Sequence, residues 1–376
     1  MKVTLNRTEF MQELQTVQRA ISSKTTIPIL TGVKLVLTDK GLTLTGSNAD
    51  ISIETFLSVE KEKVQMKIEQ TGAIILQARF FSEIIRRLPD NTVTLEVIEN
   101  NQVAITSGKA NFTVNGLDAD SYPHLPVVES QDRIEVPAHI LNKIVNETVF
   151  AVSQHESRPI LTGVHFVLEN KKLLAVATDS HRLSQRVIPL ESGEANFNIV
   201  IPGKSLTELS RSLTDEEEAI QISIMDNQVL FQTNTMKFYS RLLEGTYPDT
   251  NRLIPSSFNT EIEFSVPELL SAIERASLLS HEGRNNIVRL SINEDSVILY
   301  GNSPEIGKVE EYLSYEQVSG EPLEISFNPD YMKAALRAFG DTNITIRFIS
   351  AIRPFTLEPT ESQGSFIQLI TPVRTN

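Results

Sequence analysis

Hydrophobic and polar positions follow one order of periods that recurs along the chain. Short stretches in which every second residue is apolar, typical of half-buried strands, alternate with stretches of apolar residues spaced three or four apart, typical of helices. In the first third of the chain the order is strand, helix and three strands, and it occurs twice. The middle and final thirds show the same double order. This pattern predicts an α+β fold in which antiparallel strands dominate.

The predicted helices carry recognisable boundary signals. Asn6 is placed to cap the first helix with Glu9 three residues later, and Ser265 and Glu268 repeat that spacing in the final third. Pro89 is expected to end the second helix. The six predicted helices have apolar faces that span 10–21, 80–88, 140–148, 204–213, 269–276 and 332–339.

One six-residue phrase occurs twice without change. Pro-Ile-Leu-Thr-Gly-Val stands at 28–33 and again at 159–164, which is 131 positions later, and residues 286–290 resemble it more faintly. An offset of one domain length indicates a duplicated folding unit, so we expect each copy to open the same strand. With Pro-punctuated segments near 121–126 and 247–255, the repeats predict three domains at 1–130, 131–256 and 257–376.

Composition excludes several classes of protein. The chain has no Cys, so disulfides, thiolate metal sites and Cys nucleophiles are excluded. It also has no run of eighteen apolar residues, so we expect no membrane span. The first residues lack the apolar core of a signal peptide, so we expect none. No two of the six His have the H-x-x-x-H spacing of a metal site, and no Gly-rich phosphate loop follows a strand. We therefore expect no catalysis, metal or cofactor.

Charge is distributed unevenly along the chain. The formal net charge of −14 opposes binding of nucleic acid over the whole surface, yet the predicted helix stretches carry eleven basic and eight acidic residues. An ordinary solvated helix face remains an alternative explanation. If three twofold units self-associated into a closed ring, their helices could line a hole and present this positive charge to DNA phosphates. Contacts to the backbone alone would carry no sequence information.

Four motifs resemble a known family over the whole chain, in order. They are Pro28-Ile29-Leu30, the phrase Thr-Asp-Ser-His-Arg-Leu at 178–183, Tyr-Pro-Asp at 247–249, and Thr-Pro-Val-Arg at 371–374. The chain resembles the beta subunit of bacterial DNA polymerase III, the bacterial sliding clamp. The resemblance implies three repeated clamp domains, with helices lining a central hole and antiparallel sheets outside. It also implies a head-to-tail homodimeric ring around double-stranded DNA.

The resemblance implies further partners. They are the replicative DNA polymerase alpha subunit, an ATP-dependent clamp loader and other proteins carrying a short clamp-binding motif. It places the protein in the cytoplasm, associated with the nucleoid. A non-catalytic interaction scaffold of repeated domains without DNA encirclement is the alternative, and the acidic total favours it.

Carried over residue by residue, the resemblance gives three sets of site residues. The peptide-docking residues are Leu161, Thr178, Ser180, His181, Arg182, Leu183, Pro248, Arg252, Leu253, Ile352, Leu369, Pro372, Val373 and Arg374. The dimer-interface residues are Arg79, Ile84, Lys109, Phe112, Leu278, Leu279 and Glu311. The DNA-contacting residues are Lys24, Arg79, Arg86, Lys204, Arg211 and Lys333.

Two of these assignments have plainer alternatives. His181 and Arg182 could be a strand-end pair satisfied by neighbours, and Leu278-Leu279 could be core at the end of a helix. The sequence departs from the family pattern at Ser180, at Thr371 and in the two residues that follow Arg374. The detail of the docking site can therefore differ from other members.

Overall fold

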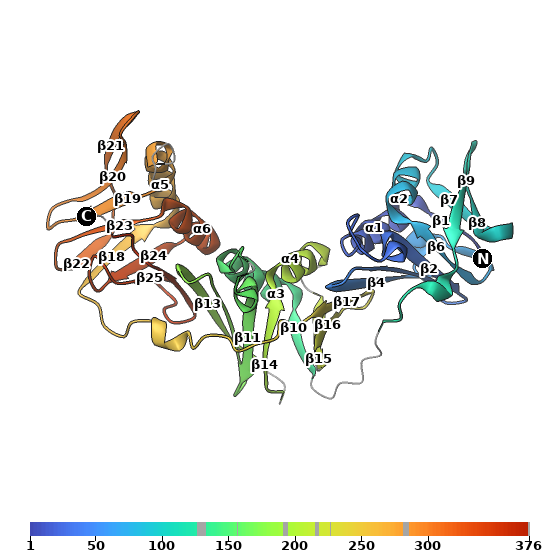
Figure 1. The fold of residues 1–376 in the computed structure, drawn as a ribbon, viewed down its shortest axis with the longest axis horizontal. Helices are drawn as coiled ribbons and strands as arrows, with labels where there is room; N and C mark the ends of the chain where they lie inside the picture. Colours follow the sequence, from blue (N-terminus) through green and yellow to red (C-terminus); the bar gives the residue numbers. More distant parts are fainter. Residues whose placement is uncertain are drawn as a thin grey trace. The chain divides into compact units, whose positions relative to one another are not determined.

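The computed structural model describes residues 1–125, 133–155, 157–190, 195–214, 218–225, 227–280 and 286–374 (Figure 1). Within these residues, strand, helix and three strands occur twice in each third of the chain, as the periodicity predicts. The short strands β5 and β22 are additions to that order. The predicted boundary at 130/131 and residues 375–376 lie outside the described residues. No described helix is long and apolar enough to cross a bilayer.

The elements have the following bounds. The first third contains β1 (Lys2–Asn6), α1 (Arg7–Gln18), β2 (Gly32–Thr38), β3 (Gly41–Ser47), β4 (Ile51–Ser58), β5 (Lys67–Gln70), β6 (Gly72–Gln77), α2 (Ala78–Arg87), β7 (Thr92–Val97), β8 (Gln102–Ser107) and β9 (Ala110–Leu117). The middle third contains β10 (Arg133–Pro137), α3 (Ala138–Thr148), β11 (Gly163–Glu169), β12 (Lys172–Thr178), β13 (Arg182–Pro189), β14 (Phe197–Pro202), α4 (Gly203–Ser212), β15 (Ala219–Met225), β16 (Gln228–Gln232) and β17 (Met236–Arg241). The final third contains β18 (Thr260–Ser265), α5 (Val266–Ser280), β19 (Val288–Ile292), β20 (Val297–Ser303), β21 (Gly307–Tyr312), β22 (Gln317–Gly320), β23 (Leu323–Phe327), α6 (Pro329–Phe339), β24 (Asn343–Phe348), β25 (Phe355–Pro359) and β26 (Phe366–Ile370).

The helix cap predicted at Asn6 is present, and α6 has a similar one. The Asn6 side chain accepts hydrogen bonds from the backbone N–H groups of Thr8 and Glu9, at 2.9 and 3.2 Å, and so begins α1. Asn328 caps α6 in the same way through Asp330, at 2.8 Å. Ile21 lies beyond the end of α1, so the first helix is shorter than its apolar spacing suggests.

The repeated hexamer differs from its prediction. Its first four residues form a 3₁₀ turn in both copies, Pro28–Thr31 and Pro159–Thr162, and the strand begins only at the glycine that follows. Proline has no N–H to donate to a strand ladder. Each Thr hydroxyl also donates to the carbonyl of the proline three residues earlier, at 2.8 and 2.7 Å. These two local constraints make the segment a turn, and the duplication gives it twice.

The chain divides into two compact units. Unit 1 comprises Met1–His139 and Lys204–Leu242, and unit 2 comprises Ile140–Gly203 and Leu243–Asn376. Unit 1 contains one sheet in the order β10-β15-β16-β17-β4-β3-β2-β6-β9-β8-β7-β1-β5. Unit 2 contains the sheets β14-β11-β12-β13-β26-β25-β24-β18-β22 and β21-β20-β19-β23. The stretch predicted as one domain, 131–256, therefore contributes to both units, through the pairs β4–β17 and β13–β26.

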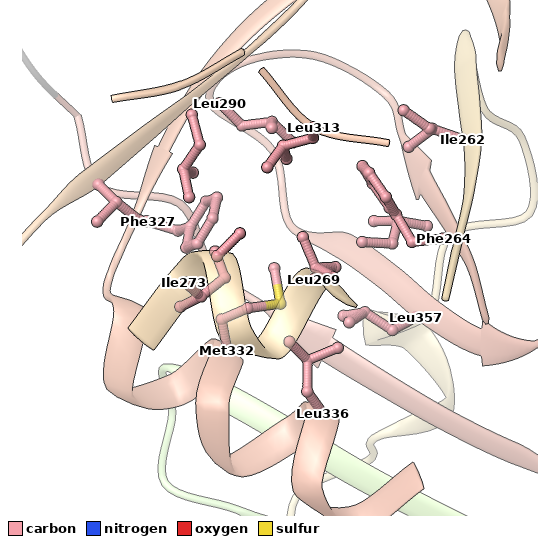
Figure 2. Close-up of a cluster of buried hydrophobic side chains, with 14 of the residues drawn as sticks. Ile262, Phe264, Leu269, Ile273, Leu290, Leu313, Phe327, Met332, Leu336 and Leu357 are labelled. Carbon is pink, nitrogen blue, oxygen red and sulfur yellow. The ribbon is translucent and has the colours of Figure 1, made fainter. Parts of the chain in front are cut away.

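Helices α5 and α6 lie side by side in unit 2, as α1 and α2 do in unit 1 (Figure 1). The core beneath α5 and α6 brings together residues from both sheets of unit 2. Figure 2 shows Ile273 and Met332 from the two helices facing Leu290 and Phe327 from β19 and β23. Strand β19 is the third copy of the hexamer strand. It pairs with β20 and β23, as β2 pairs with β3 and β6.

Candidate functional site

A tight turn between β12 and β13 arranges the most specific motif of the sequence. The Asp179 carboxylate accepts hydrogen bonds from the backbone N–H groups of His181 and Arg182, at 2.9 and 3.1 Å. The Thr178 hydroxyl donates to the Arg182 carbonyl at 2.6 Å. Ser180 at the apex adopts a left-handed φ of 78°, a conformation that is uncommon for residues other than glycine. The turn exposes His181 and brings Arg182 back along β13.

Arg182 is held from two sides. Its Nε donates to the second carboxylate oxygen of Asp179 at 3.0 Å, and its guanidinium lies 4.8 Å from the ring centroid of Tyr331 and 5.5 Å from that of Phe150. The His181 ring stacks on the same Tyr331 at 6.3 Å. Arg182 thus has the neighbours that the plainer explanation requires, while His181 keeps an exposed edge. Sequence reasoning missed Tyr331 and Phe150, because neither is near the motif in sequence.

Behind the turn lies an apolar cluster from four separate segments. Leu161, Leu183 and Leu369 are buried and pack with Tyr247. Strand β13 pairs with β26 so that Leu183 faces Leu369, and the 3₁₀ turn of the hexamer supplies Leu161. The motif residues and the C-terminal strand therefore meet in unit 2, and we name this region the unit 2 docking surface after the role that the sequence predicts for it.

Tyr247 and His165 support this surface from inside. The Tyr247 hydroxyl accepts a hydrogen bond from the Thr178 N–H at 3.2 Å, and burial raises the pKa of Tyr247. The His165 ring stacks on Tyr247 at 4.6 Å, and its Nε2 lies 2.7 Å from the Asn198 side-chain oxygen. Burial lowers the pKa of His165, and the hydrogen bond to Asn198 offsets part of that effect. Burial thus favours the neutral form of His165 over the charged one.

The remaining predicted docking residues also belong to unit 2. Leu253 and Ile352 are large apolar side chains with exposed fractions of 49% and 58%. Pro372 is buried and Val373 half-buried, and the Val373 N–H donates to the Ser326 carbonyl at 2.7 Å. The exposed members are Pro248, Arg252 and Arg374, of which Arg252 pairs with Asp249 at 2.9 Å.

Two strands with an unpaired edge contain Phe112 and Glu311, and the other five predicted interface residues lie on α2, on α5 or just before β9. Among the described residues of unit 1, positions 110–115 of β9 pair only with β8, and β6 reaches β9 only at Gly116 and Leu117. Phe112 on this strand is 42% exposed. Arg79 and Ile84 lie on α2, where Arg79 is exposed and Ile84 is half-buried. Lys109 is exposed in the turn between β8 and β9.

In the part of unit 2 that the structure describes, β21 is the outer strand of its sheet and pairs only with β20. Glu311 on β21 is bound by Arg275 of α5. Leu278 is 70% exposed, which contradicts its alternative assignment to the core, and Leu279 is half-buried. Tyr312, 69% exposed, is a further apolar residue at this edge that sequence reasoning missed.

The helix charges are partly neutralised by neighbours. The helices as observed carry ten basic and eight acidic residues among the described ones, because Arg19 follows the last residue of α1. Three predicted DNA-contacting residues pair with acids on their own helices, namely Arg86 with Glu83 at 2.8 Å, Arg211 with Glu208 at 3.0 Å and Lys333 with Asp330 at 2.8 Å. No ion pair between described residues involves Lys24, Arg79 or Lys204, and all three are exposed.

Comparison with known proteins covers the whole chain. Family models for the DNA polymerase III beta subunit match the N-terminal domain at residues 1–126, the central domain at 135–249 and the C-terminal domain at 251–374. The beta sliding clamp of Bacillus subtilis is 50% identical over 100% of both chains. That of Streptococcus pneumoniae is 49% identical over 99% of both chains.

Solved structures agree with this assignment. The crystal structure of the DNA polymerase III beta chain from Streptococcus pneumoniae has a TM-score of 0.97 with 48% identity, and it covers 100% of both chains. The sliding clamp structure from Bacillus subtilis also has a TM-score of 0.97, with 49% identity. The chain therefore belongs to the beta subunit family of DNA polymerase III, and it functions in DNA replication as a sliding clamp, a processivity factor rather than a catalyst.

Proposed function

We propose that two copies of this chain join head to tail into a ring around double-stranded DNA. The observation that carries the proposal is that β9 in unit 1 and β21 in unit 2, each with an exposed aromatic side chain, have an edge that no other described strand pairs with. An exposed edge presents unused backbone donors and acceptors, and proteins rarely leave a long one uncovered. Pairing β9 of one copy with β21 of the other would satisfy both edges and extend both sheets.

The side chains at these edges support the same arrangement. Phe112 and Phe80 are exposed in unit 1, and Tyr312 and Leu278 are exposed in unit 2. Two different apolar patches on one chain make a heterologous contact, which closes into a ring when the rotation between copies is a simple fraction of a turn. The Arg275–Glu311 pair lies beside β21 and would help to fix the register.

DNA contact in this proposal is electrostatic and independent of sequence. Lys24, Arg79 and Lys204 are the strongest of the six predicted contacts, because they lack the intrahelical acid that accompanies Arg86 and Arg211. Each phosphate contact releases counterions, so retention should weaken with salt. The acidic remainder of the chain would limit binding to DNA outside the ring.

The unit 2 docking surface is proposed to hold short linear motifs of the polymerase alpha subunit, the clamp loader and other partners. Apolar anchors would enter between Leu183, Leu253 and Ile352, while His181 and Arg182 supply polar contacts.

The loader is proposed to open the ring with ATP. We also propose the domain boundaries 1–130, 131–256 and 257–376, and association with the nucleoid.

A topological experiment tests encirclement. The protein is loaded onto a nicked circular plasmid with the cognate loader and ATP, and retention is measured before and after a single restriction cut. A ring that encircles DNA slides off the linear molecule, so retention should be lost on cutting. Retention on linear DNA would mean direct binding and would refute the ring. A scaffold without encirclement would show no preference for closed circles.

A further inference from the structure

The duplication has built one backbone frame in both units. Strands β1 and β10, helices α1 and α3, and strands β4 and β13 each begin 131 positions apart, which is the offset of the repeated hexamer. The turn before β4 also matches the turn before β13. The Asn48 side-chain oxygen accepts hydrogen bonds from the N–H groups of Asp50 and Ile51, at 2.8 and 2.9 Å, as Asp179 does at the equivalent position. Side chains at equivalent positions of the two units can therefore be compared directly.

In unit 2, a charged pair fills the space between α3 and β13. The Arg186 Nε lies 3.3 Å from the Glu147 carboxylate, and the two side chains are only 15% and 8% exposed. The Arg186 guanidinium also lies 5.8 Å from the ring centroid of Phe366, its partner in the β13–β26 ladder. A cation, an acid and a large apolar side chain thus occupy this part of the frame.

In unit 1, the equivalent residues are smaller and uncharged, and they leave a cavity. Thr16 and Thr55 stand at the positions of the unit 2 acid and cation, and Met236 pairs with Thr55 as Phe366 pairs with Arg186. The two threonines and the methionine line a cavity of about 330 Å³, which is large enough for a small molecule. We name it the α1–α4 cavity, after the two helices that contribute to it. Every residue that lines it belongs to unit 1.

Two polar groups at the lining of the α1–α4 cavity are short of partners. Glu13 is half-buried, and Lys61, a cation that acts on it, forms its ion pair with Glu9 instead, at 3.7 Å. Burial raises the pKa of Glu13, and the nearby Thr55 hydroxyl and Lys61 offset only part of that effect. The Thr55 side chain is 1% exposed, and its hydroxyl makes no hydrogen bond of normal geometry to any described residue. Since an unpaired buried polar group is costly, a ligand that donates hydrogen bonds and carries positive charge would satisfy both.

The other charged groups at the lining do not reverse this preference. Arg19 and Arg211 are exposed and both pair with Glu208, at 3.6 and 3.0 Å. Glu218 adds a further carboxylate, which accepts a hydrogen bond from the Asn234 N–H at 2.8 Å. The lining also includes the last turns of α1 and α4, and a helix C-terminus carries about half a negative charge. With the acid on α1, three carboxylates and two helix ends outweigh two guanidiniums among the described residues.

From this geometry we propose that the α1–α4 cavity binds a small organic cation, a guanidinium group on a short aliphatic chain. The guanidinium donates to the Glu13 carboxylate and to the Thr55 hydroxyl, and it takes the place that Arg186 has in unit 2. The aliphatic chain lies against Met236. The bound cation joins α1 to β4 as Arg186 joins α3 to β13, so it stabilises unit 1. This site is separate from the unit 2 docking surface and does not depend on the proposed ring.

Equilibrium dialysis of the full-length protein with isotope-labelled agmatine, a butylamine that carries a guanidinium, tests the proposal. Agmatine should bind the native chain. N-carbamoylputrescine, in which a neutral urea replaces the guanidinium, should compete at least about tenfold more weakly. Glu13→Gln keeps the shape of the side chain and should weaken agmatine by about tenfold or more, because a hydrogen bond to a charged group is lost. Glu83→Gln is the matched control, because it removes one carboxylate from α2, outside the lining, and should leave agmatine binding unchanged.

Thr55→Arg tests the correspondence between the two units. It supplies from the chain itself the guanidinium that unit 2 has at this position, so it should abolish agmatine binding and raise the unfolding midpoint. Absence of binding at millimolar agmatine, equal competition by N-carbamoylputrescine, or native affinity in Glu13→Gln would each overturn the site. A folded Thr55→Arg chain that still bound agmatine would also refute it. Tighter binding of acetyl-Gly-Arg-Gly-amide than of agmatine would assign the cation to an arginine of a partner protein and would refute the small-molecule ligand.

Discussion

Asp179 offers a direct test of how the docking turn is built. In Asp179→Ala the N–H groups of His181 and Arg182 lose their acceptor, and Arg182 loses its ion pair. Hydrogen bonds to a charged group contribute about 1.5–3 kcal/mol each when both partners are shielded from water. The Asp179 side chain is 14% exposed but His181 is exposed, so water replaces part of the loss. We expect the turn to be destabilised by about 2 kcal/mol.

The matched variant is Asp179→Asn. An amide oxygen can accept the same two backbone hydrogen bonds, as Asn48 does at the equivalent position of unit 1. This variant loses mainly the ion pair with Arg182, which for a partly buried surface pair is worth about 1 kcal/mol or less. The alanine variant should therefore be clearly weaker than the asparagine variant.

Hydrogen exchange of individual backbone amides measures this difference locally. For opening of the turn, 2 kcal/mol corresponds to roughly thirtyfold faster exchange of the His181 and Arg182 amides, and Asp179→Asn should stay within about fivefold of the native rate. Asn48→Ala should accelerate the Asp50 and Ile51 amides and leave those of unit 2 unchanged. Equal exchange in both Asp179 variants would show that the acceptor atoms do not hold the turn, and the reasoning would fail.

Three further predictions concern assembly, pH and DNA. Leu278→Asp should convert the proposed dimer to a monomer by native mass measurement, whereas Leu253→Asp, at a similarly exposed site, should not; a dimeric Leu278→Asp would refute the edge contact. Because the pKa of His165 is lowered in the fold, the unfolded chain binds its proton first as pH falls below about 6.5. Stability should therefore decrease with falling pH, and His165→Phe should flatten denaturation midpoints between pH 7.5 and 5.5; an unchanged slope would contradict this. The double variant Lys24→Glu, Lys204→Glu should shorten retention on closed circular DNA and reduce the salt dependence of that retention, without lowering the unfolding midpoint. The variant Arg86→Glu should shorten retention less, because Glu83 already pairs with Arg86.

The order of elements and the duplication were readable from the sequence. Alternation and helical spacing depend on which face of an element is buried, which is a local property, so each predicted helix is present in the structure. The cap at Asn6 is equally local, since its partners lie within three residues. The repeated hexamer also predicted that two parts of the chain would have the same backbone. The two side-chain turns at Asn48 and Asp179 agree with this.

The sequence misled where the local signal was incomplete. The hexamer reads as an apolar strand, but proline cannot donate to a ladder and Thr31 bonds back to Pro28, so a 3₁₀ turn precedes the strand. The excess of basic over acidic residues on the helices also overstated how many cations are available to DNA. Whether a cation is available to a phosphate depends on its neighbours one turn away, as Arg211 and Glu208 show.

Tertiary structure alone decided which distant residues share a surface. Tyr331 reaches Arg182 because α6 packs in the same unit as β13, and no period in the sequence encodes that contact. The unpaired sides of β9 and β21 likewise follow from sheet order, which depends on long-range pairing. Local periodicity determines which elements form and which face each buries, whereas strand pairing and packing between elements determine which edges stay open and which side chains meet.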